Sequence, residues 1–228
     1  IHRPHDPPAE RRSNAVPNRA MIGAEPPTER LTVSTQRSTG RDLAQVAVFA
    51  GIIAVLGLIP AIAPFGNAVP ITAQSLGIML AGAILGARRG VLAVLVLLAL
   101  VALGLPLLAG GRGGLGVFAG PSVGYLIGWP IAAWAIGAMT QAMGTPYRTA
   151  VGIGINVLGG VLLLNLLGVV GMVLRADLSV GAAFVAAAPF VPGDLAKAVI
   201  CAVVAKGVHA AYPGLIRARR VAREDALV

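Results

Sequence analysis

Two charged residues, Asp194 and Lys197, stand in the almost wholly apolar stretch FVPGDLAKAVI, residues 190–200. A carboxylate and an ammonium three positions apart share one face of a helix, so they can partly neutralise each other. A charged residue at the centre of a membrane helix costs about 2.5–3.5 kcal/mol. Apolar residues would serve a purely structural role at least as well. The pair therefore favours a functional site, and a self-contained ion pair is the alternative.

The helix that carries this pair is expected to begin at Pro192 and Gly193 and to run inward to the basic C-terminus. The pair then faces a cavity on the outer side of a membrane. A carboxylate accepts hydrogen bonds and an ammonium donates them. The two groups together suit a small solute that has both donors and acceptors.

The motifs of common enzyme classes are absent from the chain. Residues 111–116, GRGGLG, match a dinucleotide-binding pattern in form, but an apolar span precedes them and no acidic residue occurs in residues 115–147. No P-loop and no H-E-x-x-H motif occurs. The histidines, which could serve as metal ligands or as a catalytic base, lie in or near the tails: His2, His5 and His209. We therefore expect neither an enzyme nor a metal or cofactor site.

Arg112 is the only charge in this glycine-rich segment. One interpretation is a loop on the outer side that folds closely over a bound molecule, because glycine accepts positive φ without penalty. The other is a flexible loop with a solvated arginine. The segment alone favours the second interpretation.

The composition is that of an integral membrane protein. Of 228 residues, 57% are hydrophobic and 12% are charged, against about 25% charged in soluble domains. The net charge of +9 does not indicate nucleic-acid binding, because most basic residues lie at the two ends of the chain. The single Cys201, in apolar sequence, is expected to be a small buried side chain.

The apolar runs predict an all-α bundle with six membrane spans, where a spanning helix needs about 20 residues. We place them at residues 43–63, 71–85, 90–105, 118–140, 149–174 and 192–211. The second span is short and is expected to be tilted or partly buried in protein. Residues 1–41 are then a disordered cytoplasmic tail, residues 42–211 the membrane domain, and residues 212–228 a basic cytoplasmic tail.

The basic residues predict the orientation of the bundle. With six spans, fifteen of the eighteen Lys and Arg residues fall on the side of the two termini and two fall on the other side. Positive charge favours the cytoplasmic side. Both termini are therefore expected in the cytoplasm, in a multi-pass protein of the bacterial inner membrane.

Three segments resemble the BioY family, the biotin-binding S components of energy-coupling factor (ECF) transporters. They are AVPITAQSLGIMLAGAILGARRG (residues 68–90), LGLPLLAGGRGGLGVFAGPSVGYLIG (residues 103–128) and PGDLAKAV (residues 192–199). The resemblance covers residues 43–211 in the same order. The family usually reads V-P-I-T-L-Q-T-L and G-P-T-G-G-Y, and this chain departs from it at Ala73, Ser75, Ser122 and Val123.

The resemblance implies a six-helix S component that captures biotin from outside the cell for uptake. Such proteins associate with a membrane coupling (T) subunit and two cytoplasmic ATPases. Carried over by motif, the substrate-binding positions are Gln74, Arg112, Tyr125, Asp194 and Lys197. The glycine-rich loop is then the lid over the site.

The resemblance also implies a partner surface on the first span. S components dock on the coupling subunit through an Ala-x-x-x-Ala surface of this helix, and Ala50 and Ala54 have that spacing. Packing against a neighbouring span is the alternative, because small residues serve both purposes.

Other functions remain open: an S component for another small vitamin, a membrane enzyme, and a small channel or structural membrane protein. The low aromatic content of 4% disfavours thiamine and riboflavin, which call for aromatic platforms.

Overall fold

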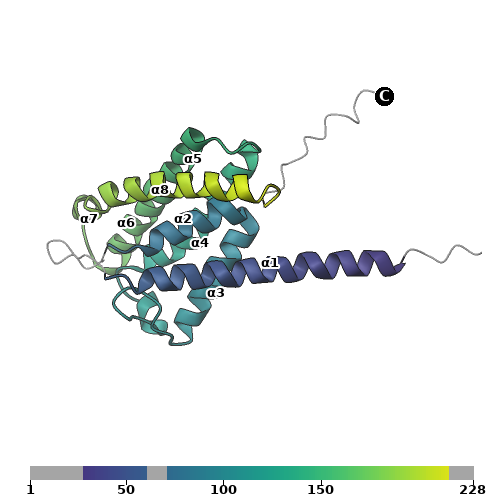
Figure 1. Ribbon diagram of the computed structural model, residues 1–228. Coiled ribbons are helices and arrows are strands. Elements are labelled where there is room, and N and C mark those ends of the chain that lie inside the picture. Colours follow the sequence, from purple (N-terminus) through teal and green to yellow (C-terminus); the bar gives the residue numbers. More distant parts are fainter. Residues whose placement is uncertain (1–27, 61–70, 216–228) are drawn as a thin grey trace, which may run out of the picture. The chain divides into compact units, whose positions relative to one another are not determined.

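The computed structural model describes residues 28–60 and 71–215, with side chains from Thr39 onward. Residues 1–37 and residues 38–228 form separate units, and the helical bundle belongs to the second. The described residues form only helices and their connections (Figure 1). In chain order the helices are α1 (Thr28–Gly57), α2 (Gln74–Leu85), α3 (Ala87–Ala102), the 3₁₀ turn η2 (Leu115–Phe118), α4 (Val123–Met143), α5 (Thr149–Asn156), the π-helical η3 (Val157–Leu163), α6 (Leu164–Arg175), α7 (Val180–Ala187) and α8 (Phe190–Ala211).

The helices follow the six predicted spans in order, which confirms the all-α class. Three described helical stretches have the length and apolar character to cross a bilayer: Thr39–Gly57, Val123–Met143 and the continuous rod Thr149–Arg175. α7 and α8 meet at a bend of 49° and provide a fourth if they are taken together. α2 has 12 residues and α3 has 16, so both are shorter than the roughly 20 residues of a straight span.

Two boundaries differ from the sequence prediction. α1 begins at Thr28, so residues 28–41 are helical although a disordered tail was predicted there. No proline follows Pro27 in this region, so nothing stops a helix that extends outward from the apolar segment. α7 was not predicted, because its eight residues are too few for a span; the Ser179 side chain caps it by accepting from the Ala182 amide at 3.2 Å. The remainder of the N-terminal tail and residues 216–228 lie outside the described residues.

Glycines set the helix separations around α4, which packs against α2, α3 and α6. A Cβ on Gly124 would overlap the carbonyl oxygen of Leu167 and approach Gly171 Cα to 2.8 Å. A Cβ on Gly82 would lie 2.6 Å from the Ala133 carbonyl oxygen. Lipid tails are as apolar as leucine side chains, so the hydrophobic effect contributes little to helix association within a bilayer. Close backbone packing of this kind provides much of the attraction between helices instead.

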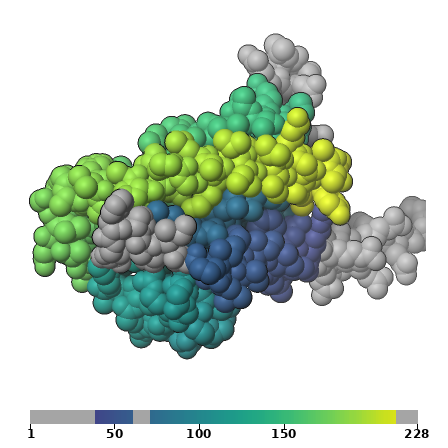
Figure 2. All heavy atoms as spheres, turned by 60° about the vertical axis from the view of Figure 1, so that its left-hand side comes forward, coloured from purple at the N-terminus to yellow at the C-terminus, as the bar shows by residue number. Residues whose placement is uncertain are grey.

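The same packing brings the first turns of α2, α4 and α8 together at one end of the bundle. α8 lies along α2 and α5, and Figure 2 shows α8, in yellow, next to α2, in blue. At the opposite end, Arg89 of α3 donates to Asp42 at 3.1 Å and to Gln45 at 2.6 Å, and it also binds the Leu215 carbonyl. Each end of the bundle thus has its own polar cluster.

The α4–α6 crossing gives a test of the fold. We expect Gly124→Val to lower the melting temperature of the purified protein, because overpacking costs about 1–3 kcal/mol. Gly154→Val in α5 is the control, because no atom lies within 4 Å of the position that its Cβ would take. Differential scanning fluorimetry in detergent measures both. Equal melting temperatures for the two variants would contradict the close approach of α4 and α6.

Candidate substrate-binding site

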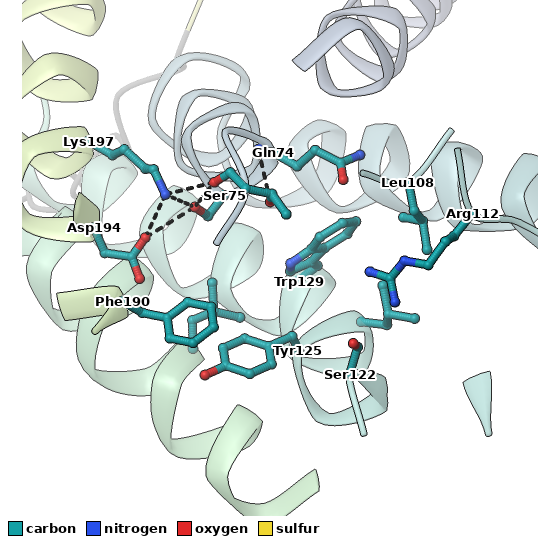
Figure 3. A pocket seen from close by; sticks show the side chains of 13 residues that line it. Gln74, Ser75, Leu108, Arg112, Ser122, Tyr125, Trp129, Phe190, Asp194 and Lys197 are labelled. Atoms are coloured by element: carbon teal, nitrogen blue, oxygen red, sulfur yellow. Dashed lines mark hydrogen bonds and ion pairs between the residues drawn. The ribbon is translucent and has the colours of Figure 1, made fainter. Parts of the chain in front are cut away.

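One pocket at the end of the bundle contains all five substrate-binding residues that the sequence predicted. Its empty space is about 520 Å³, with the part open to solvent included. The predicted residues come from α2, the α3–α4 connection, α4 and α8: Gln74, Arg112, Tyr125, Asp194 and Lys197 (Figure 3). Eight further residues complete the lining: Thr72, Ser75, Leu108, Ser122, Leu126, Trp129, Leu164 and Phe190.

Lys197 is fully hydrogen-bonded at the α8 side of this pocket. Its Nζ donates to Asp194 Oδ1 at 3.0 Å, to Ser75 Oγ at 2.9 Å and to the Thr72 carbonyl at 2.8 Å. An ammonium has three donors, so each of them has an acceptor. The Lys197 side chain is 15% exposed and that of Asp194 is 4% exposed. The predicted helical ion pair is therefore present, and α2 shares in it.

Asp194 is also held from α2 and α6, by residues that the sequence analysis did not select. Ser75 Oγ donates to Asp194 Oδ1 at 3.2 Å, and Asn165 Nδ2 donates to Asp194 Oδ2 at 3.2 Å. The Tyr125 hydroxyl donates to Asn165 Oδ1 at 3.1 Å. An asparagine in an otherwise apolar span is itself a signal of function, so the sequence could have indicated Asn165.

Aromatic rings form the wall next to this polar network. The rings of Tyr125 and Phe190 stack with centroids 5.5 Å apart and an interplanar angle of 21°. A Cβ on Gly168 would overlap the Tyr125 ring, so the ring can take this position only because residue 168 is glycine. Trp129 is also buried at the pocket. The wall offers flat apolar surface to a ring or a methylene chain.

Arg112 supplies the charge on the other side of the pocket. Leu108 and Arg112 exchange backbone hydrogen bonds at 3.0 and 3.2 Å. The turn between them needs glycine, because Gly110 and Gly111 have φ of 79° and 70°. Arg112 Nε donates to the Ala109 carbonyl at 3.2 Å, and no described acidic residue pairs with the guanidinium. The arginine is thus placed to meet an anion.

The two charged ends of the pocket lie apart. Figure 3 shows Arg112 on the far side from Asp194 and Lys197, with Trp129 and Tyr125 between them. The site can therefore bind an elongated molecule that has a hydrogen-bonding head, an apolar middle and an anionic end. No group of three or more His, Cys, Asp or Glu side chains that could hold a metal ion occurs among the described residues.

Gln74 lies in the wall of the pocket, but its side-chain amide is bonded to the backbone. Its Nε2 donates to the Leu107 carbonyl at 3.0 Å, and its Oε1 accepts from the Ala109 amide at 3.2 Å. Only 1% of the residue is exposed. Gln74 thus lies at the pocket, where the prediction put it. Its amide is hydrogen-bonded to backbone groups, however, whereas an amide that binds a ligand would have free donors.

The two alanines predicted to contact the coupling subunit are not exposed on α1. Ala50 is only 4% exposed, and Ala54 is half-buried against the core. The reason is that Val46, Ala50 and Ile53 recur at helical spacing and together form the buried face of α1. Two small residues on the same helix, Ala47 and Gly51, are exposed instead. Spacing alone could not distinguish these two faces.

The fold and the pocket together define a multi-pass helical membrane protein with a pocket of charged and aromatic side chains at one end of the bundle. The family model described as "BioY family" matches residues 30–214, and the chain belongs to this family. Its relatives include a biotin transporter BioY of Rhodobacter capsulatus, 47% identical over 78% of this chain and 98% of that protein. Another, from Rhizobium etli, is 44% identical over 76% of this chain and 95% of that protein.

A solved structure supports the same assignment. The crystal structure of the S-component for biotin from an ECF-type ABC transporter matches with a TM-score of 0.72 and 29% sequence identity. The match covers 82% of this chain and 95% of that one. The fold is therefore that of the ECF S components, as the resemblance implied.

The buried pair predicts a characteristic pattern of stability. Lys197→Met should lower the free energy of unfolding by about 3–5 kcal/mol, because it leaves a buried carboxylate without its counter-charge. The double variant Asp194→Asn/Lys197→Met should recover most of this loss, because no buried charge remains. The amide oxygen can still accept from Asn165, and the amide N–H can donate to the Ser75 hydroxyl. Thermal unfolding in detergent measures both, and Lys206→Met, an exposed lysine of α8, is the control. A double variant as unstable as the single one would contradict the assigned ion pair.

Proposed function

We propose that this chain is the substrate-binding membrane subunit that captures biotin from outside the cell for uptake by an ECF transporter. The observation that carries the proposal is the pocket with a carboxylate–ammonium pair at one end, an arginine that no described acidic residue pairs with at the other, and aromatic rings between them. Biotin has a ureido ring with two N–H donors and a carbonyl acceptor, an apolar chain and a terminal carboxylate. The relatives named as biotin transporters support the same substrate.

The geometry supports one orientation of biotin. Asp194 accepts from a ureido N–H, and Lys197 donates to the ureido carbonyl in place of the Thr72 carbonyl or the Ser75 hydroxyl. The apolar chain lies along Tyr125 and leads to Arg112, which binds the carboxylate. Charge-assisted hydrogen bonds of this kind are short and strong. Because the network already holds the acidic and basic groups in place, little reordering accompanies binding.

The direction of capture follows from the distribution of charge. Arg88 and Arg89 in the first turn of α3, and Arg148 just before α5, lie at the end of the bundle away from the pocket. Positive charge favours the cytoplasmic side. The pocket then opens to the outside of a bacterial inner membrane, and both termini lie in the cytoplasm.

Uptake of the captured substrate requires further subunits beside this chain. We place this chain with a membrane coupling (T) subunit and two ATPase subunits, since the matched solved structure is an S-component of an ECF-type ABC transporter. The binding pocket accounts for capture, and ATP hydrolysis belongs to the other subunits. We propose that the coupling subunit contacts the exposed face of α1, where the small residues Ala47 and Gly51 would allow a helix to approach closely.

Ligand binding tests the substrate. Biotin should raise the melting temperature of the detergent-purified protein by mass action, whereas thiamine and riboflavin should not. Asp194→Asn and Lys197→Ala should each weaken biotin binding by about 1.5–3 kcal/mol, because each removes a charge-assisted bond. Isothermal titration calorimetry measures the affinities, and Lys206→Ala should bind as the unmodified chain does. Normal biotin affinity in both pocket variants would refute the site.

The partner surface has a separate test. Gly51→Trp should block co-purification with the coupling subunit and abolish ATP-driven biotin uptake, because the indole prevents close helix contact. Biotin affinity of the isolated variant should stay near that of the unmodified chain, since Gly51 is exposed and a Cβ added there would meet no packed neighbour within 4 Å. Ala50→Trp should instead destabilise the isolated chain, because Ala50 is buried. Full assembly of the Gly51→Trp variant would move the partner surface away from this face.

A further inference from the structure

We infer that Gln74 is a positioning residue: it fixes the loop that carries Arg112 against the outer end of α1 and does not itself contact the substrate. This inference rests on the proposed function, because it concerns how the substrate site is kept closed. It differs from the assignment of Gln74 as a substrate ligand.

The amide of Gln74 is already occupied by backbone groups of two other segments. Nε2 donates to the Leu107 carbonyl at 3.0 Å and to the Ile53 carbonyl of α1 at 3.4 Å. Oε1 accepts from the Ala109 amide at 3.2 Å. A carboxamide has two N–H donors, and both have acceptors here. A substrate acceptor could reach either N–H only by breaking one of these bonds inside a buried site, which is unfavourable. Only the second lone pair of Oε1 stays open, and the residue is just 1% exposed.

These bonds hold one arm of the turn whose other arm carries Arg112. Leu107 and Ala109 flank Leu108, and Leu108 exchanges both backbone hydrogen bonds with Arg112. Fixing the first arm therefore fixes the arginine as well. Around Gly110 and Gly111, at the tip of the turn, no atom lies within 4 Å of a built Cβ position, so the tip depends on its base for support.

In the described part of the chain, hydrogen bonds tie the base of the loop to α3 and to α1. Gly114 and Leu105 donate to the Val101 and Leu100 carbonyls of α3 at 2.8 and 3.1 Å. Gln74 provides the link to α1. Glycine is needed where α1 ends, because a Cβ on Gly57 would overlap the Leu107 carbonyl and lie 2.7 Å from Gln74 Nε2. The end of α1, the Gln74 amide and the loop thus meet at one tightly packed junction.

Arg112 provides a direct way to observe this junction. It is the only Lys or Arg between Arg89 and Arg148, so trypsin cuts this loop only after Arg112. Cleavage requires local opening of the loop. Gln74→Ala should raise the rate of this cut in biotin-free protein by roughly tenfold or more, since two or more buried hydrogen bonds are lost. Mass spectrometry identifies the fragment that begins at Gly113.

Two comparisons separate this effect from general destabilisation. Gln141→Ala removes another side-chain amide that binds the backbone of a helix connection, since its Oε1 accepts from the Ala87 amide at 3.3 Å. It should leave the cut after Arg112 unchanged. Gly57→Ala disturbs the junction from the α1 side and should raise the cleavage rate as Gln74→Ala does. Gly40→Ala changes another glycine of α1, where an added Cβ would meet no packed neighbour within 4 Å, and it should have no effect.

Biotin kinetics add a readout that a merely structural role would not move. Gln74→Ala should raise the dissociation rate of biotin more than it lowers the association rate, because the loop opens more often. In the Arg112→Ala background the effect of Gln74→Ala on biotin affinity should largely disappear, since residues that act through one another are not additive. Fully additive effects would place Gln74 in direct contact with biotin and overturn the inference.

Unchanged cleavage in both Gln74→Ala and Gly57→Ala would also overturn it. If Gln74→Ala does not fold, Gln74→Glu and Gly57→Ala carry the test, because Glu keeps the acceptor for Ala109 and loses both donors. The cleavage assay contains no biotin. A chain that fails to bind biotin would therefore refute the proposed function and leave the assignment of Gln74 to be decided by its own measurement.

Discussion

The cost of burying the Asp194 carboxylate is the constraint on which the rest of the site depends. A buried charge is tolerated only when it is paired and hydrogen-bonded. Here Lys197 neutralises it at 3.0 Å, and α2 and α6 supply Ser75 and Asn165 at 3.2 Å each. Three helices must therefore meet at one depth in the bundle. Their convergence creates a polar pocket in a protein that is otherwise apolar.

Close helix packing makes this convergence possible. Gly124 and Gly168 bring α6 against α4, and Gly168 leaves room for the Tyr125 ring beside the network. The remaining charge, on Arg112, comes from the glycine turn of the α3–α4 connection rather than from a helix. The site thus combines a polar end held by three helices with a charged end held by a loop.

The sequence predicted the features that follow from the cost of charge in lipid. Asp194, Lys197 and Arg112 could be selected because few other charges occur in the apolar region, and the span order follows from apolar length. The buried face of α1 could not be predicted, because the Ala50–Ala54 and Ala47–Gly51 pairs have the same spacing and only tertiary packing decides between them. The bonding of Gln74 depends on backbone groups of residues 53, 107 and 109, which are distant from it in sequence. Residues 28–41 were predicted as a tail because their composition is polar, and helix propagation from α1 outweighed that signal.

The central claim is that the Asp194–Lys197 pair is present to bind biotin and not to stabilise the fold. Equilibrium dialysis of labelled biotin tests it most directly, with the purified chain and the neutral double variant Asp194→Asn/Lys197→Met side by side. The account predicts saturable binding at one site in the unmodified chain, and loss of binding in a double variant that still unfolds near the same temperature. A double variant that remains folded and binds biotin as the unmodified chain does would contradict it.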